Sequence, residues 1–184
     1  TLRHSSAASD VYKRQNYHRA AARGIGNAKA IGNYSASLYP LTKAKKEGYD
    51  EVIYLDSVDG QCIEELGSAN LFICKDGVIK TPKLSGSILD GVTRNSVCRI
   101  AKDVLGIKVE ETDIHLDELL EADEVFCTGT AVVVAPVGKV TYQNKVHHFS
   151  GGSIGPITNK CKDTLTSIQR EEITDPFGWV LKIK

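Results

Sequence analysis

The sequence predicts an α+β domain in which helices pack on a mixed β-sheet. Short strand-like and helical segments alternate from residue 17 onward, and no internal repeat or low-complexity linker interrupts them. The chain has 184 residues, of which 41% are hydrophobic and 25% are charged. This length and composition are typical of one globular domain with a sizeable core.

The first half of the domain predicts a helix followed by three strands. Apolar residues recur at three-residue spacing in residues 35–47, which indicates a helix whose first turns are limited by Pro40. Residues 51–56 are a predicted strand. Residues 70–74 and 78–81 are predicted to pair as a hairpin, because the Asp-Gly pair between them supplies the positive φ angles of a tight turn.

The second half predicts two longer helices separated by strands. Apolar residues in 92–105 fall on one face of a helix that ends near Gly106. Residues 131–137 are nearly all apolar, which predicts a strand buried on both faces. The other predicted elements are strands at 107–115 and 124–128, a short acidic helix at 116–122, a hairpin at 140–148 and a closing helix at 154–170.

Residues 1–16 differ from the rest of the chain. They carry scattered charge without apolar periodicity, and they lack the apolar stretch of a secretory signal. Residues 5–15, SSAASDVYKRQ, resemble a translated library-adapter sequence. We therefore expect residues 1–16 to be a leader foreign to the domain, which occupies residues 17–184, and we expect a native N-terminal part to be missing.

Composition excludes several classes of function. The 23 basic residues balance the 23 acidic ones, so neither nucleic acid nor an anionic membrane surface is expected as the main partner. No apolar stretch is long enough for a transmembrane helix. The five cysteines contain no CxxC pair, which predicts free thiols. The adjacent His147 and His148 would face opposite sides of a strand, so no metal site is expected.

A lone lysine lies in a run of small residues at positions 26–34, GNAKAIGNY. Small residues let the backbone approach a ligand closely. A lysine that is desolvated there can lose its proton near neutral pH and attack a carbonyl group to form a Schiff base. Lys29 is therefore a candidate nucleophile. A surface lysine that only keeps the protein soluble would produce the same local pattern.

Three further motifs follow in order: Glu65 ahead of Asn-Leu-Phe at 70–72, Leu-Asp-Gly-Val-Thr-Arg at 89–94, and Gly-Thr-Ala at 129–131. Together with the lysine run they resemble the pyridoxal-phosphate enzymes of aminotransferase class IV, most closely the branched-chain amino acid aminotransferases. The resemblance covers about residues 17–183. It implies the mixed-sheet pseudo-barrel of the family's large domain. In the family, a small N-terminal domain supplies an arginine to the phosphate and most of the side-chain pocket, and we expect that domain to be missing from this chain.

The resemblance assigns roles around pyridoxal 5'-phosphate as the cofactor. Lys29 would bind the cofactor aldehyde and shuttle a proton, and Tyr34 would hydrogen-bond the phenolic oxygen. Family register, five residues ahead of Asn70, selects Glu65 over Glu64 as the carboxylate that keeps the pyridine nitrogen protonated. The two side chains face opposite ways on a strand, so only one of them can meet the ring, unless both are solvated. Asn70 is expected to support that strand.

The remaining roles concern the ring face, the phosphate and the substrate. Leu89 would pack on the pyridine ring. Val92 and Thr93 would hold the phosphate at the start of a helix, where free N–H groups and the helix dipole favour a dianion. Thr130 would also contact the phosphate, and the amides of Thr130 and Ala131 would bind the substrate carboxylate.

The function that the resemblance implies is amino transfer between Leu, Ile or Val and 2-oxoglutarate. The closing residues 175–183 and the run 129–137 favour the branched-chain group over D-amino acid aminotransferase and aminodeoxychorismate lyase, which remain alternatives within the class. Asp90 departs from the commoner Leu-Pro-Gly and adds a negative charge near the phosphate. Expected partners are an amino acid, a 2-oxo acid and a second copy in a homodimer, in the cytoplasm or an organelle. A non-catalytic fragment that only folds or dimerises is the alternative from another class.

Overall fold

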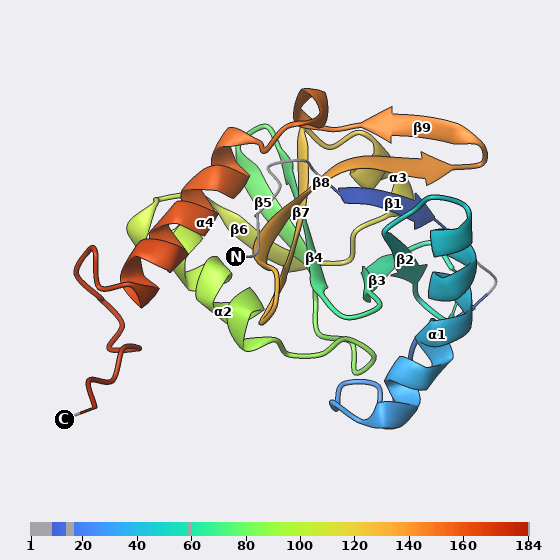
Figure 1. Ribbon diagram of the computed structural model, residues 1–184, viewed down its shortest axis with the longest axis horizontal. Helices are drawn as coiled ribbons and strands as arrows, with labels where there is room; N and C mark the ends of the chain where they lie inside the picture. Colours follow the sequence, from blue (N-terminus) through green and yellow to red (C-terminus); the bar gives the residue numbers. More distant parts are fainter. Residues whose placement is uncertain (1–8, 14–16, 59, 184) are drawn as a thin grey trace.

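One curled sheet organises the fold of this chain (Figure 1). The computed structural model describes residues 9–13, by their backbone only, and residues 17–58 and 60–183. The strands are β1 (Ser9–Lys13), β2 (Glu51–Leu55), β3 (Ile63–Leu66), β4 (Asn70–Lys75), β5 (Val78–Pro82), β6 (Val109–Thr112), β7 (Glu124–Gly129), β8 (Val133–Tyr142) and β9 (Lys145–His148). Within the described residues these nine strands run in the order β3-β2-β1-β8-β7-β4-β5-β6, with β9 on β8.

The sheet closes on itself because β3 pairs with β4 as well as with β2. Glu65 on β3 lies opposite Asn70 on β4, which completes a ring of β3, β2, β1, β8, β7 and β4. In this ring β1 is parallel to both of its neighbours, and the other pairs are antiparallel. The predicted mixed-sheet pseudo-barrel is confirmed, with β5, β6 and β9 as extensions outside the ring.

Residues 9–13, which lie within the expected leader, take part in the sheet. Ser9–Lys13 form β1, which lies between β2 and β8 and pairs Val11 with Glu51 on one side and with Val140 on the other. Backbone N–H and C=O groups on two neighbouring open edges favour any extended segment that can satisfy them, whatever its side-chain pattern. That residues 1–16 are a foreign leader stays a prediction.

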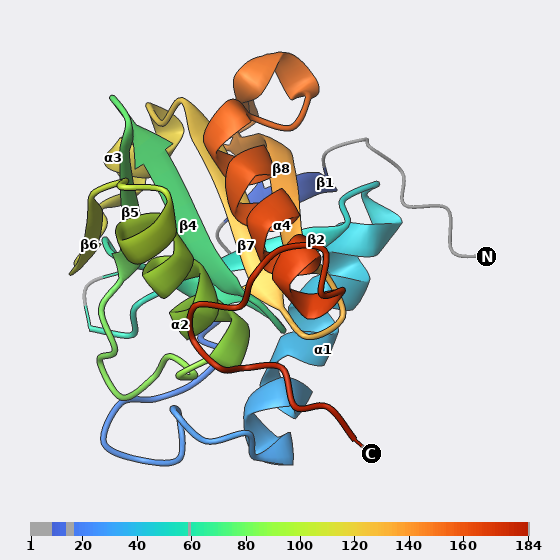
Figure 2. The same cartoon turned by 90° about the vertical axis from the view of Figure 1, so that its left-hand side faces the viewer.

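Helices cover the outside of the ring in two places (Figures 1 and 2). They are α1 (Ile31–Lys46), α2 (Val92–Arg99), α3 (Leu116–Leu120) and α4 (Pro156–Gln169), together with the π-helical turn η1 (Ile100–Val104) and the 3-10 turn η2 (Ser150–Gly152). Side chains of the ring strands alternate between two cores. Leu71 and Ile73 of β4 join the cluster inside the ring, whereas Phe72 stacks on Phe126 in the cluster beneath α2 and α4.

The predicted helices and strands mostly match, with two corrections. Pro40 does not limit the first turns of its helix, because α1 begins at Ile31 and continues through the proline. The apolar run at 131–137 is not a doubly buried strand: Ala131 lies in a turn, and β8 starts at Val133 and buries only part of its side chains. Tertiary packing decides both cases. Helix α1 packs on β2, and β8 contributes Val137 to the cluster inside the ring and Val134 to the cluster beneath α4, while the side chains between them are only partly covered.

Turn chemistry accounts for the elements that the sequence predicted best. Asp76 and Gly77 have φ angles of 50° and 78° at the β4–β5 turn, as the hairpin requires.

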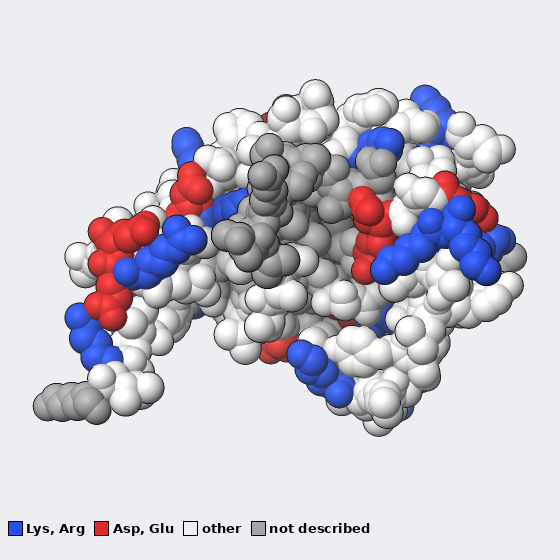
Figure 3. All heavy atoms as spheres, in the orientation of Figure 1, with Lys and Arg blue, Asp and Glu red and all other residues white. Residues whose placement is uncertain are grey.

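None of the helices in the described part of the chain is long and apolar enough to cross a bilayer. On the face in Figure 3, acidic and basic side chains of the described residues lie close together at both margins.

Candidate functional site

A cavity of about 310 Å³ opens where β4 begins, β7 ends and α2 begins. Asn70 and Thr128 pair across β4 and β7 at this place, and Gly91 precedes α2 beside them. The predicted site residues on its wall are Lys29, Tyr34, Glu65, Leu89, Val92, Thr93 and Thr130. Residues that are far apart in the sequence therefore share one cavity, and of the predicted site residues Ala131 alone is not on its wall.

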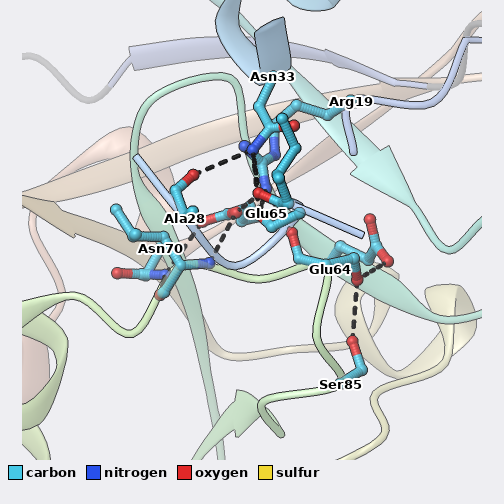
Figure 4. A network of polar contacts seen from close by, with 11 residues as sticks. Arg19, Ala28, Asn33, Glu64, Glu65, Asn70 and Ser85 are labelled. Atoms are coloured by element: carbon cyan, nitrogen blue, oxygen red, sulfur yellow. Dashed lines mark hydrogen bonds and ion pairs between the residues drawn. The ribbon is translucent and has the colours of Figure 1, made fainter. Parts of the chain in front are cut away.

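Glu65 forms the buried end of the cavity, with 3% of its surface exposed. Its carboxylate accepts hydrogen bonds from the Leu89 N–H and the Asn70 side-chain amide, each at 3.1 Å, and forms an ion pair with Arg19 (Figure 4). Burial raises the pKa of Glu65 to about 7, although Arg19 and the Leu89 N–H oppose that shift. The carboxylate is thus held in one orientation by donors from three separate segments.

Glu64 faces away from this cavity, as the alternation of a strand requires. It lines a different cavity and accepts a hydrogen bond from the Ser87 hydroxyl. The alternative in which Glu64 and Glu65 are both solvated is wrong, because they are 4% and 3% exposed. Asn70 supports the site as expected, since its amide also donates to the Leu89 carbonyl at 2.8 Å.

Arg19, which no sequence motif singled out, also lines the cavity and is 3% exposed. Besides pairing with Glu65, its guanidinium donates to the backbone carbonyls of Ser87 and Gly26. It therefore joins the segment ahead of Lys29 to β3 and to the segment ahead of α2. The only signal in the sequence was weak: one arginine followed by three alanines, ten residues before the candidate lysine.

Lys29 lies in the loop that leads into α1, and the start of that helix holds the loop in place. The Asn33 side-chain amide donates to the carbonyls of Ile25 at 2.6 Å and Ala28 at 3.0 Å. Tyr34, in the first turn of α1, is half-buried on the same cavity wall. The expectation of a desolvated lysine is wrong for this chain, because Lys29 is exposed. No described segment covers it from the solvent side.

The turn before α2 fits closely against the carboxylate end. Gly91 precedes the helix without a side-chain cap, which leaves the N–H groups of Val92 and Thr93 for a ligand. A Cβ atom at position 91 would overlap Asn70 Oδ1, so glycine is needed there for packing. Leu89 is half-buried, and Asp90 is exposed at the cavity edge.

Threonines line the cavity at the end of β7. Thr128 is fully buried, and its hydroxyl has no hydrogen-bond partner among the described residues. Thr130 is exposed on the wall, and Ala131 is exposed in the turn outside it. Thr128 was not among the predicted site residues, although it directly precedes the Gly-Thr pair at 129–130. A buried hydroxyl without a partner at a cavity wall can serve a ligand.

This arrangement suits one small molecule with several polar groups. A fixed carboxylate and a lysine amine both line the cavity, with helix N–H groups and threonine hydroxyls beside them for an anion. The described residues contain no group of three or more His, Cys, Asp or Glu side chains that could hold a metal ion.

Comparisons with known proteins agree with this geometry. A family model described as amino-transferase class IV matches residues 3–140. The chain is 47% identical to branched-chain-amino-acid aminotransferase 3, chloroplastic, of Arabidopsis thaliana, over 91% of this chain and 40% of that protein. It superimposes on the branched-chain amino acid aminotransferase of Escherichia coli with a TM-score of 0.83 and 36% identity, covering 94% of this chain and 56% of that one.

A further structure, the branched-chain amino acid aminotransferase of Thermobaculum terrenum in its PLP-form, matches with a TM-score of 0.80 and 27% identity, over 89% of this chain and 52% of that one. The chain spans about half the length of these proteins. The family model covers most of the chain and includes the site from Arg19 to Thr130. The chain belongs to the amino-transferase class IV family.

Proposed function

We propose that this chain is the cofactor-binding part of a branched-chain amino acid aminotransferase. The reaction transfers the amino group of Leu, Ile or Val to 2-oxoglutarate and yields a branched-chain 2-oxo acid and glutamate. The observation that carries the proposal is the single cavity that brings Lys29, Tyr34, Glu65 and Thr93 together. The names of the relatives and the PLP-form of the Thermobaculum terrenum enzyme support it.

The cavity fits pyridoxal 5'-phosphate by the chemistry of its donors. Glu65 would meet the pyridine nitrogen, Tyr34 the phenolic oxygen, and the Val92 and Thr93 amides the phosphate. The Thr128 hydroxyl, which has no hydrogen-bond partner among the described residues, and the close approach of Gly91 to Asn70 leave a polar wall for such a ligand. When bound, the cofactor supplies an electrophilic carbonyl and a ring that accepts electrons from the substrate α-carbon.

The side chains of this chain do the remaining work. Arg19 and Asn70 hold the Glu65 carboxylate against the ring position, and Leu89 limits where a flat ring can lie. The Lys29 amine is the group that can take a proton from the substrate α-carbon and return it. The amides of Thr130 and Ala131 would orient the substrate carboxylate at the open side of the cavity.

Absorbance spectroscopy with the chain and pyridoxal 5'-phosphate tests the proposal. We expect a visible band from lysine-bound cofactor, lost in Lys29→Ala and kept in Lys45→Ala, which removes a lysine from the far end of α1. A band of equal strength in Lys29→Ala would contradict the assignment. Oxo-acid formation from L-leucine but not from D-alanine, measured with the full-length protein, distinguishes the branched-chain reaction from D-amino acid transamination.

Assembly and location belong to the same proposal. We infer a homodimer, checked by sedimentation of the chain at several concentrations. We also infer an intracellular site of action, in the cytoplasm or an organelle, which the chloroplastic relative supports. Fluorescence microscopy of the tagged full-length protein tests the location.

A further inference from the structure

A second cavity, of about 250 Å³, lies on the other side of β3 from the candidate site. It shares no lining residue with the site cavity. Glu64 lines it, along with residues that follow β2 and residues between β5 and α2. Nothing in the proposed transamination uses this cavity.

Glu64 is the unusual group in its wall. The residue is only 4% exposed, and the Ser87 hydroxyl donates to Oε1. The other oxygen, Oε2, has no hydrogen-bond partner among the described residues. A buried carboxylate oxygen without a donor is costly and is relieved by a proton or by a cationic partner. Burial raises the pKa of Glu64, in line with this missing partner.

The other charges at this cavity are already used. The Lys83 ammonium pairs with Asp113 at 2.6 Å. Asp56 accepts hydrogen bonds from backbone N–H groups, including those of Val58 and Cys62. The wall thus carries three carboxylates and one lysine, and that lysine pairs with Asp113 rather than with Glu64. Arg19 also acts electrostatically on Glu64, but its ion pair is with Glu65, so the charge that remains to be balanced at this wall is negative.

We propose that this cavity binds a short aliphatic ammonium ion, whose N–H groups donate to the Glu64 carboxylate. The absence of a metal-binding group among the described residues favours an organic cation. Val58, Pro82 and Ile88 offer apolar surface to its carbon chain. A ligand that also carries a carboxylate, such as an amino acid, meets repulsion from Asp56 and Asp113. The ligand class is therefore a small amine that lacks an acid group.

The cavity is connected to the candidate active site through one residue. The Ser87 hydroxyl donates to Glu64, and the Ser87 carbonyl accepts a hydrogen bond from Arg19, which pairs with Glu65 (Figure 4 shows the network). An ammonium ion that draws Glu64 toward itself acts on this bond. The NMR signals of Arg19 and Glu65 are therefore expected to change when the second cavity is occupied.

Titration by NMR with 2-methylpropylammonium tests the proposal on the chain without added cofactor, so that no aldehyde is present to react with the amine. L-Valine is the matched ligand, because it has the same carbon branch and adds a carboxylate. We expect saturable binding of the amine and none of L-valine. Glu64→Gln, which keeps the size and removes the charge, is expected to weaken amine binding at least about tenfold. Glu65→Gln, the matched change in the site cavity, acts on Glu64 only through Arg19 and Ser87 and is expected to weaken amine binding much less.

The opposite pattern overturns the proposal. If amine binding is lost in Glu65→Gln and kept in Glu64→Gln, the amine binds in the site cavity instead. If L-valine binds equally well, or if the amine does not bind at all, there is no amine site in the second cavity. Circular dichroism checks that each variant is folded. If Glu64→Gln does not fold, Ala22→Phe decides, because Ala22 lines the cavity from an exposed position and a larger side chain there blocks entry. Unchanged binding in Ala22→Phe contradicts the assignment.

Discussion

The carboxylate end and the lysine end of the site cavity differ in how the chain holds them. Glu65 and Arg19 are almost fully buried and are tied to three segments. Lys29 is exposed on a loop whose backbone carbonyls accept hydrogen bonds from the Asn33 amide and, at Gly26, from Arg19. The chain therefore preorganises the group that would meet the cofactor ring, whereas the lysine amine is exposed to water. Stability and reactivity are expected to respond to different substitutions.

The largest expected effect is at the buried end. Arg19→Met removes the cation from a buried pair and leaves the Glu65 carboxylate with two neutral donors, so we expect a loss of about 3–5 kcal/mol in the free energy of unfolding. Urea denaturation followed by circular dichroism measures it. Arg23→Met, in the same loop but exposed, should stay within about 0.5 kcal/mol. Equal losses in the two variants would remove the contrast between the ends.

The pH dependence of the free energy of unfolding tests the same carboxylate end of the cavity. The folded chain binds a proton at Glu65 more tightly than the unfolded chain, because the folded pKa is raised to about 7. This contribution is fully present below the unfolded pKa, is lost as the pH rises through about 7, and amounts to about 3–4 kcal/mol. Unfolding free energies at several pH values between 4 and 8 test it. Glu65→Gln should flatten that slope, and an unchanged slope would assign it to another group.

Gly91 and Gly32 offer a matched pair of smaller changes. In Gly91→Ala the new methyl group meets Asn70 Oδ1, so the amide must leave Glu65 and the chain loses about 1–3 kcal/mol. In Gly32→Ala the nearest atom is Ile25 Cδ1 at 3.9 Å, and alanine is the better helix residue, so stability should rise by up to about 1 kcal/mol. Thermal unfolding of both variants gives the sign of each effect. A loss in both would mean that the start of α1 is as tightly packed as the turn before α2.

The smallest expected effect on stability is at the lysine end. Lys29→Met removes an exposed side chain without buried partners, so we expect a change within about 0.5 kcal/mol. The variant should nevertheless lose the absorbance of lysine-bound cofactor. A marked loss of stability in Lys29→Met would show that the lysine end is structural, as the buried end is.

Local chemistry made some parts of this molecule predictable. The β4–β5 hairpin follows from Asp76-Gly77, and α4 follows from Pro156 at its start and an apolar stripe. The resemblance to the family selected eight site residues, and seven of them lie on one cavity wall. Other features depend on contacts between residues that are far apart in the sequence. No local sequence pattern predicts three of them: β1, the continuation of α1 through Pro40, and the burial of Arg19 beside Glu65. Each depends on contacts with residues that are distant in sequence.

The position of β1 has a consequence for how the chain folds. Its neighbour β8 lies near the other end of the sequence, so that Ser9 pairs with Val137. Most of the chain must be synthesised before the ring of strands can close, and the entropy of closing so long a loop is spent before those contacts form. We expect slow folding with an open-edged intermediate, in which β2 and β8 are exposed to pairing with other chains. Aggregation during refolding, rather than instability of the finished barrel, would then limit the yield of this protein.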